Sequence, residues 1–135
     1  EKIKVLFICH GNICRSTMAQ YVFQNLINRY DLTDQFYIDS AATSREEIGN
    51  PIITALGGKL KEVGIPCGDH RARQLQKWEY DEFDYLIGMD SMNIRNMMRI
   101  LGSDTGREGV EMLDFTERTG QDIADPWYTG NFDRT

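Results

Sequence analysis

A run of apolar residues near the N-terminus is the first strong pattern in the chain. Residues 3–8, IKVLFI, are nearly all apolar, which predicts a central strand of a parallel sheet that is covered on both faces. The run stops at Cys9. Downstream, apolar side chains recur at helical spacing and predict an amphipathic helix over about residues 16–29: Met18, Val22, Phe23, Leu26, Ile27 and Tyr30. The residues between this strand and this helix therefore form a connecting loop.

Two further segments extend the pattern into a doubly wound α/β fold. A second extended run, residues 36–40, completes a β-α-β unit whose crossover is expected to be right-handed. Asn50 followed by Pro51 predicts the start of a helix, with Asn50 as the N-cap and proline at the first helical position. The apolar face of this helix, which should end at Gly64, comprises Ile52, Ile53, Leu56, Leu60 and Val63.

The second half of the chain predicts another strand and helix, followed by a short strand. Residues 85–89, YLIGM, form the third predicted strand, and Asp90 or Ser91 can cap a helix that stops at Gly102. A short fourth strand is expected over residues 110–113. The stretch 114–135 is rich in Asp, Thr and Gly without periodicity, which predicts a loop.

Composition limits the classes of protein that fit. A chain of 135 residues with 41% apolar residues suits one domain, residues 1–135, with a single core. A net charge of −6 argues against partners such as nucleic acid or an anionic membrane, which need a basic surface. The three cysteines are irregularly spaced and fit neither a disulfide framework nor a structural zinc site. No apolar window approaches the roughly 18 residues of a membrane span, so we expect a soluble, cytoplasmic protein.

The loop after the first strand carries candidate chemistry. In open parallel sheets, ligands bind beyond the carboxyl ends of the strands. A loop at this place can turn backbone N–H groups inward beside a helix N-terminus and hold a phosphate-like dianion. Gly11 and Asn12 tolerate the left-handed backbone angles that such a loop requires. Arg15 adds a planar guanidinium that can bind two phosphoryl oxygens.

Cys9 is the candidate nucleophile. The donors that would hold a phosphate also stabilise a thiolate, which can attack phosphorus. Ser16 can donate a hydrogen bond to the sulfur, or it can serve as a plain helix N-cap. The structural alternative for Cys9 is a small buried apolar residue at a strand end.

Six short segments together resemble the low-molecular-weight protein tyrosine phosphatase family. They occur in the order that the family uses: CHGNICRS at 9–16, DSAATS at 39–44, EIGNP at 47–51, HRARQL at 70–75, DYLIGMD at 84–90 and ADPWY at 124–128. The resemblance covers essentially the whole chain. It implies a flavodoxin-like four-stranded parallel sheet with helices on both faces. It also implies a phosphomonoesterase with a cysteinyl-phosphate intermediate and no metal or other cofactor.

The resemblance also assigns roles to individual residues. Cys9 would be the nucleophile, Arg15 the phosphate ligand and Asp125 the general acid and base, although an Asp-Pro pair alone is more often a turn. Ser40 and His70 would support the loop. Trp127 and Tyr128 would wall the substrate cleft, or simply pack. The residues expected to contact the substrate through the loop are His10, Gly11, Asn12, Ile13, Cys14 and Ser16.

The expected partners are phosphotyrosine-containing proteins or small aryl phosphates, with phosphate or sulfate-like anions binding in the same site. Ile13 is typical of members that act on phosphotyrosine, whereas threonine there marks relatives that act on phosphoarginine. Arg45 and Glu46 depart from the family, because many members present an aromatic residue to the substrate in this loop. Cys14 either captures an oxidised Cys9 as a protective disulfide or fills space.

Two rival functions and one structural expectation remain. An arsenate reductase of the same fold would need two further cysteines near residues 80–90, and that stretch has none. A phosphate-recognition module without turnover would not need Cys9, Arg15 and Asp125 together.

The family normally continues into a final helix beyond the point where this chain stops, at Thr135. Without that helix, an apolar sheet face would be exposed, which predicts low stability or association with another chain.

Overall fold

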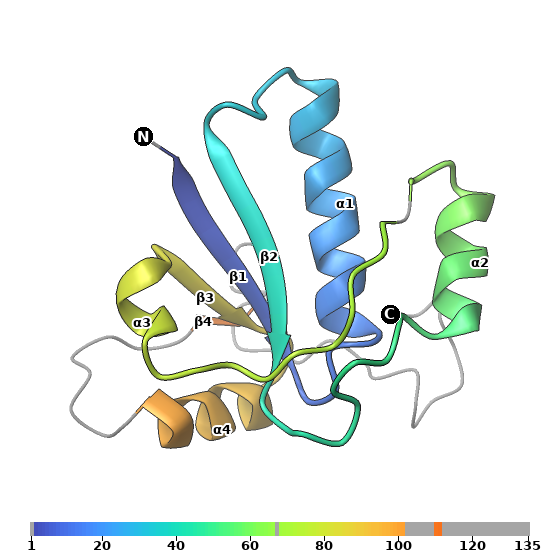
Figure 1. The fold of residues 1–135 in the computed structure, drawn as a ribbon. Coiled ribbons are helices and arrows are strands. Elements are labelled where there is room, and N and C mark those ends of the chain that lie inside the picture. The colour runs from blue at the N-terminus through green and yellow to red at the C-terminus, as the bar shows by residue number, and fades with distance from the viewer. Residues whose placement is uncertain (1, 67, 102–109, 112–135) are drawn as a thin grey trace.

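A computed structural model describes residues 2–66, 68–101 and 110–111 of the chain. These residues form a parallel four-stranded sheet in the order β2-β1-β3-β4, with helices on both faces (Figure 1). The strands are β1 Ile3–Cys9, β2 Phe36–Ala42, β3 Tyr85–Gly88 and β4 Val110–Glu111. The helices are α1 Arg15–Arg29, α2 Thr54–Glu62, α3 Glu79–Glu82 and α4 Ser91–Leu101. The expected flavodoxin-like α/β architecture is confirmed.

Strand β1 divides the core into two layers. Its central position makes it apolar on both faces, because a parallel sheet is covered on each side. Val5, Phe7 and Cys9 point into one buried cluster, which also contains residues of α1. Leu6 and Ile8 point into the cluster on the opposite face, which contains residues of α4. Alternate side chains of one strand thus hold a helix on each face of the sheet.

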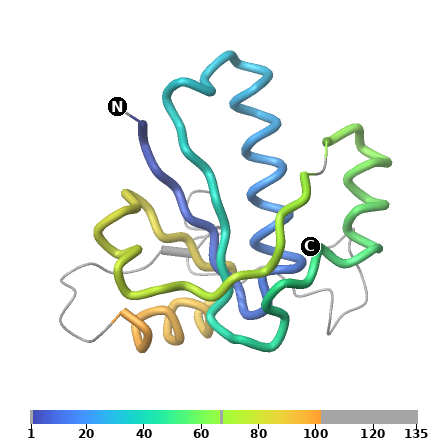
Figure 2. Tube along the Cα trace, viewed as in Figure 1, coloured from blue at the N-terminus to red at the C-terminus, as the bar shows by residue number. Residues whose placement is uncertain are grey.

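Helix α2 lies beside α1 rather than on the sheet (Figure 2). Leu56 and Leu60 of α2 are buried against Tyr21 of α1 in a third, smaller cluster. The helix ends at Glu62, and Gly64, two residues later, has a φ of +78°, the left-handed conformation that commonly terminates a helix. No helix in the described ranges is long and apolar enough to span a membrane.

The predicted start of the second helix is wrong. Asn50 and Pro51 lie outside any helix, with Pro51 in an antiparallel bridge to Arg71, and α2 begins at Thr54. The Asn50 carbonyl accepts a hydrogen bond from Ala72 N at 2.9 Å. A pairing between Asn50-Pro51 and Arg71-Ala72, segments distant in sequence, therefore overrides the local N-cap signal.

Most other predicted elements are confirmed within one or two residues. Helix α1 and strand β3 have nearly the expected bounds, and Asp90 rather than Ser91 caps α4. The short helix α3 was not predicted. Strand β4 is confirmed at residues 110–111, while the predicted end of α4 at Gly102 and the loop over 114–135 lie outside the described residues.

A pair of glycine substitutions tests the packing of α4 on β3. A Cβ atom added at Gly88 would lie 3.2 Å from Asn93 Cβ and 3.0 Å from Ile94 Cγ1, so Gly88→Ala should lower the free energy of unfolding by about 1–3 kcal/mol. In contrast, Gly58 lies inside α2 with nothing near its added Cβ, so Gly58→Ala should raise that free energy by about 0.5–1 kcal/mol. Urea unfolding measures both. A Gly88→Ala protein as stable as the wild type would contradict the close approach.

Candidate active site

The loop between β1 and α1 lies at the carboxyl end of the sheet. Cys9 is the last residue of β1 and only 4% exposed, and α1 begins six residues later at Arg15. Asn12 has a φ of +60°, a left-handed conformation that asparagine adopts more readily than most residues. This turn brings the loop back over the end of the strand.

Two polar groups of the loop contact the sulfur of Cys9. The backbone N–H of Asn12 lies 3.2 Å from Sγ, and the hydroxyl of Ser16 lies 3.0 Å from it. The amide Nδ2 of Asn12 donates to Ser16 Oγ at 2.8 Å, which leaves the hydroxyl hydrogen of Ser16 free to point at the sulfur. Donors aimed at one sulfur stabilise its anionic form.

Asn12 is held by a buried network behind the loop. Its Oδ1 accepts hydrogen bonds from His70 Nε2 at 2.7 Å and from the backbone N–H of Arg73 at 3.3 Å. His70 Nε2 also lies 3.2 Å from Ser40 Oγ, and Ser40 donates to Gln20 Oε1. Because the backbone N–H of Arg73 can only donate, Oδ1 must face it, and the orientation of the Asn12 amide is fixed.

Burial lowers the pKa of His70. The nearby carboxylate of Asp39, whose Oδ1 lies 3.7 Å from His70 Nδ1, opposes this shift but does not cancel it. A neutral imidazole with its proton on Nε2 is the form that donates to Asn12 Oδ1.

Arg15 lies beside the loop with its guanidinium paired to Asp90. The side chain is 5% exposed, and its Nη1 lies 2.7 Å from Asp90 Oδ2. Asp90 follows β3, the neighbour of β1, so two adjacent strand ends bring these residues together across 75 positions of sequence. An ion pair of this kind fixes the direction of the guanidinium.

Asp90 also begins α4. Its Oδ1 accepts a hydrogen bond from the backbone N–H of Asn93 at 2.7 Å, and the Asn93 side chain accepts from the Asp90 N–H at 3.1 Å. This reciprocal pair is a capping box, with asparagine in the place of the usual Glu or Gln. One carboxylate thus caps a helix and orients Arg15.

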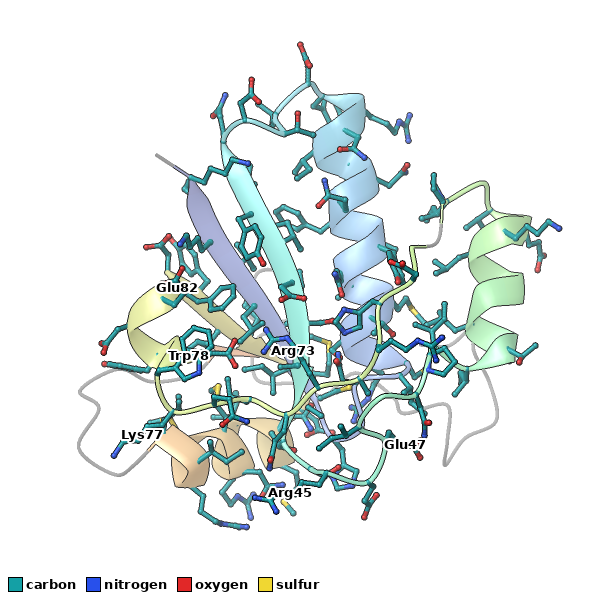
Figure 3. The ribbon with its side chains drawn as sticks, viewed as in Figure 1. Arg45, Glu47, Arg73, Lys77, Trp78 and Glu82 are labelled. Carbon is teal, nitrogen blue, oxygen red and sulfur yellow. The ribbon has the colours of Figure 1, made fainter. Side chains whose placement is uncertain are left out.

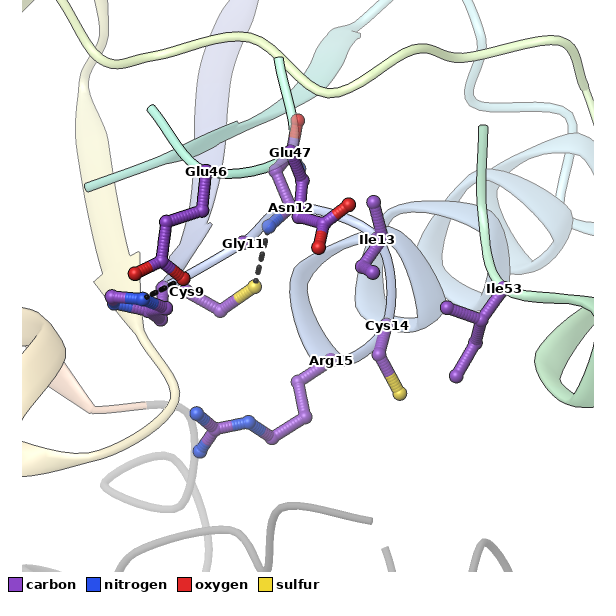
Figure 4. Close-up of a pocket in the computed structure, with 10 residues that line it drawn as sticks. Cys9, Gly11, Asn12, Ile13, Cys14, Arg15, Glu46, Glu47 and Ile53 are labelled. Carbon is purple, nitrogen blue, oxygen red and sulfur yellow. Dashed lines mark hydrogen bonds and ion pairs between the residues drawn. The ribbon is translucent and has the colours of Figure 1, made fainter. Parts of the chain in front are cut away.

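A pocket of about 140 Å³ opens over the loop (Figure 4). Cys9 lies in it with the Arg15 side chain beside it, and Glu46 and Glu47 lie on the β2 side. The pocket is lined by Cys9, His10, Gly11, Asn12, Ile13, Cys14, Arg15, Glu46, Glu47 and Ile53.

The structure brings most of the predicted site residues together. Seven consecutive loop residues line the pocket, with Ser16 behind the sulfur and Ser40 and His70 in the supporting network. Ser16 is not the N-cap of α1, because Cys14 occupies that position. Cys9 and Cys14 are not joined by a disulfide, and their side chains point in different directions in Figure 4. Three predicted residues lie outside the described part of the chain: Asp125, Trp127 and Tyr128.

Several contributing residues were not predicted for the site. Asp90 was expected only as a helix cap, although its place at the end of a strand was the available signal. Gln20 and Arg73 support Ser40 and Asn12 from positions with no local motif. Within residues 2–66, 68–101 and 110–111, no group of three or more His, Cys, Asp or Glu side chains is arranged to hold a metal ion.

Comparison with known proteins finds one family along almost the whole chain. The family model described as low molecular weight phosphotyrosine protein phosphatase matches residues 4–135. The low molecular weight protein-tyrosine-phosphatase YfkJ of Bacillus subtilis is 38% identical over 132 residues, which cover 97% of this chain and 85% of YfkJ. The human low molecular weight phosphotyrosine protein phosphatase is 39% identical over 128 residues, which cover 94% of this chain and 80% of the human protein.

Solved structures share the fold. The crystal structure of YfkJ matches with a TM-score of 0.93 at 37% identity, over 99% of this chain and 85% of that one. A protein tyrosine phosphatase from Entamoeba histolytica, solved with Hepes in its active site, matches with a TM-score of 0.85 at 29% identity. That match covers 94% of this chain and 81% of the Entamoeba protein.

The lowered pKa of His70 predicts a loss of stability in acid. Below about pH 6.5 the unfolded chain binds a proton that the native His70 resists, so the free energy of unfolding should fall as pH decreases, by at most about 1.4 kcal/mol per pH unit. Above that pH the contribution is complete. Urea unfolding from pH 8 to about pH 5 measures it.

Two variants isolate the histidine responsible. His70→Gln keeps a donor for Asn12 Oδ1 but cannot titrate, so its stability should depend less on pH than that of the wild type. His10→Gln changes the exposed histidine on the rim of the pocket, and its free energy of unfolding should fall in acid as much as that of the wild type. Equal slopes for His70→Gln and wild type would contradict the assignment.

Proposed function

The chain belongs to the low molecular weight phosphotyrosine protein phosphatase family, and from this premise we propose that it hydrolyses phosphotyrosine in proteins, and small aryl phosphates, through a cysteinyl-phosphate intermediate. The observation that carries the proposal is the environment of Cys9. Its sulfur accepts a hydrogen bond from the Asn12 N–H and lies 3.0 Å from the Ser16 hydroxyl, inside a pocket that Arg15 also lines. A buried structural cysteine needs neither feature.

The loop supplies binding and electrostatic stabilisation. Its backbone N–H groups and the N-terminus of α1 attract the phosphoryl oxygens, and Arg15 contributes a planar pair of donors. The negative charge spreads over the equatorial oxygens in the transition state, so donors fixed in advance lower the barrier. Asp90 supports this role by holding the guanidinium in one direction.

The reaction proceeds in two displacements. The Cys9 thiolate attacks phosphorus, the S–P bond forms and the bond from phosphorus to the phenolic oxygen breaks. Asp125 protonates the leaving phenolate, whose conjugate acid has a pKa near 10. Water then attacks phosphorus while Asp125 accepts its proton; the new O–P bond forms, the S–P bond breaks, and the Cys9 thiolate is regenerated as inorganic phosphate is released. The role of Asp125 rests on the family resemblance.

Ser16 and Asn12 assist at both steps. Their hydrogen bonds stabilise the thiolate before attack and again as it leaves phosphorus in the second displacement. We expect Trp127 and Tyr128 to wall the cleft against the aromatic ring. We also expect the enzyme to act in the cytoplasm and to need no metal.

Steady-state hydrolysis of p-nitrophenyl phosphate at mildly acidic pH, with a chelator present, tests the mechanism. Activity should survive the chelator and disappear in Cys9→Ser. Asp125→Ala should lower kcat by about 10²- to 10⁴-fold, the usual contribution of a positioned proton donor. Asp34→Asn, which removes an exposed carboxylate at the opposite end of the sheet, is the matched control and should retain activity. Full activity in Cys9→Ser would refute the proposal.

Removing the Ser16 hydroxyl should slow the reaction without abolishing it. A hydrogen bond to a charged group contributes about 1.5–3 kcal/mol, so Ser16→Ala should lower kcat by roughly 10- to 100-fold. The effect should be smaller in Ser16→Thr, which keeps the hydroxyl. Pre-steady-state release of p-nitrophenol separates attack from breakdown of the intermediate. An unchanged kcat in Ser16→Ala would exclude a role for this hydroxyl.

A further inference from the structure

The segment after β2 is fastened to the phosphate loop and forms its rim. The backbone N–H of Thr43 donates to the carbonyl of Cys9 at 2.9 Å, and the N–H and hydroxyl of Ser44 donate to the carbonyl of His10 at 3.1 and 2.9 Å. At the other end of the segment, Gly49 N donates to Ala72 O at 2.8 Å. These bonds hold the backbone between the two anchors beside the phosphate loop.

Two carboxylates of this segment line the pocket. Glu46 Oε2 lies 2.9 Å from His10 Nε2, and both side chains are largely in solvent. Glu47 is half-buried, and its Oε2 accepts a hydrogen bond from Asn50 Nδ2 at 2.6 Å. Its Cγ lies 3.4 Å from the position that a Cβ atom on Gly11 would occupy, so the side chain lies directly against the loop (Figure 4).

The described arginines nearest this rim have partners other than its carboxylates. Arg45 Nε donates to Gln74 Oε1 at 3.1 Å, and Arg45 and Glu47 lie apart in Figure 3. Arg71 donates to the carbonyl of Gly49, and neither arginine lines the pocket. Arg15 is buried beside the loop and paired with Asp90. Among the described lining residues, two carboxylates therefore face one histidine at the entrance.

We propose that Glu46 and Glu47 determine peptide specificity by favouring phosphotyrosine flanked by Lys or Arg and disfavouring acidic neighbours. The inference rests on the proposed function. Ile13 and Ile53 provide the apolar wall of the same pocket, and a hydrogen bond from Ile53 N to Ile13 O at 3.1 Å joins them. With the phosphate on the loop and the ring against these isoleucines, the residues that flank phosphotyrosine lie at the rim.

The phosphate loop and the carboxylates of the rim act in opposite ways on a negatively charged peptide. The loop attracts the phosphate dianion, while the rim repels a second negative group on the same peptide and attracts a positive one. At a partly solvated rim, each ion pair between a carboxylate and the peptide contributes only modestly to the free energy of binding. We therefore expect kcat/KM for a basic peptide to exceed that for a matched acidic peptide by about 3- to 10-fold.

The experiment compares two phosphotyrosine peptides that differ only in Lys or Glu on either side of the phosphotyrosine. The kcat/KM ratio is measured for wild type, Glu46→Gln, Glu47→Gln and the double variant. Because each variant changes attraction for every phosphate dianion, the ratio of the two peptides is the informative quantity. Asp34→Asn removes one negative charge about 20 Å away, at the amino end of β1, and is the control for net charge.

In the wild type, kcat/KM should be higher for the basic peptide than for the acidic one. The ratio of the two values should fall toward one in the double variant and stay at the wild-type value in Asp34→Asn. It should also fall in about 1 M salt, where the Debye length is about 3 Å. A wild-type ratio near one, or a ratio that persists in the double variant, would overturn the inference while leaving the phosphatase proposal intact.

Binding of the same peptides by Cys9→Ser protein keeps the two proposals separate. This variant lacks the nucleophile and does not hydrolyse the peptides, so the difference between their dissociation constants measures the effect of the rim charges on binding. An inactive wild type would refute the phosphatase proposal, whereas equal affinities for the two peptides would refute the acidic rim.

Discussion

The side chain of Asn12 is the point on which the candidate site depends. Its left-handed backbone turns the loop over Cys9, its N–H points at the sulfur, and its amide bonds simultaneously to Ser16, His70 and the backbone of Arg73. Asn12 is fully buried, so each of these groups must be satisfied inside the protein. A loop that would otherwise be adaptable is thereby held in one shape before any anion arrives, which removes an ordering cost from binding.

Local sequence patterns predicted the elements whose formation depends mainly on residues close to one another in the chain. The two-sided apolar run of β1, the helical spacing of α1 and the turn chemistry at Gly64 all correspond to the observed elements. The start of α2 was mispredicted because the 50–51 segment pairs with residues 71–72, a partner that no local window contains. Helix α3, only four residues long, has too little periodicity to be recognised.

The same distinction applies to the site. The loop from Cys9 to Ser16 is contiguous, so its spacing and residue types sufficed to predict a phosphate-binding loop. The pair formed by Arg15 and Asp90 and the contacts of Gln20 and Arg73 join distant parts of the chain, and only the strand order brings them together. The acidic rim depends on the path of residues 43–50, which hydrogen bonds to the loop determine.

The double use of Asp90 joins two parts of the molecule that are usually considered separately. The same carboxylate caps α4 and holds the guanidinium of Arg15, so opening the first turn of the helix also releases the arginine. An anion that binds only when the arginine is in place therefore favours the folded first turn of α4. The free energy of anion binding is then added to the local stability of a helix that packs on the opposite face of the sheet from α1. Amide protons in the first turn of α4 should thus report, through their exchange rates, on occupancy of a pocket that neither Asp90 nor any residue of α4 lines.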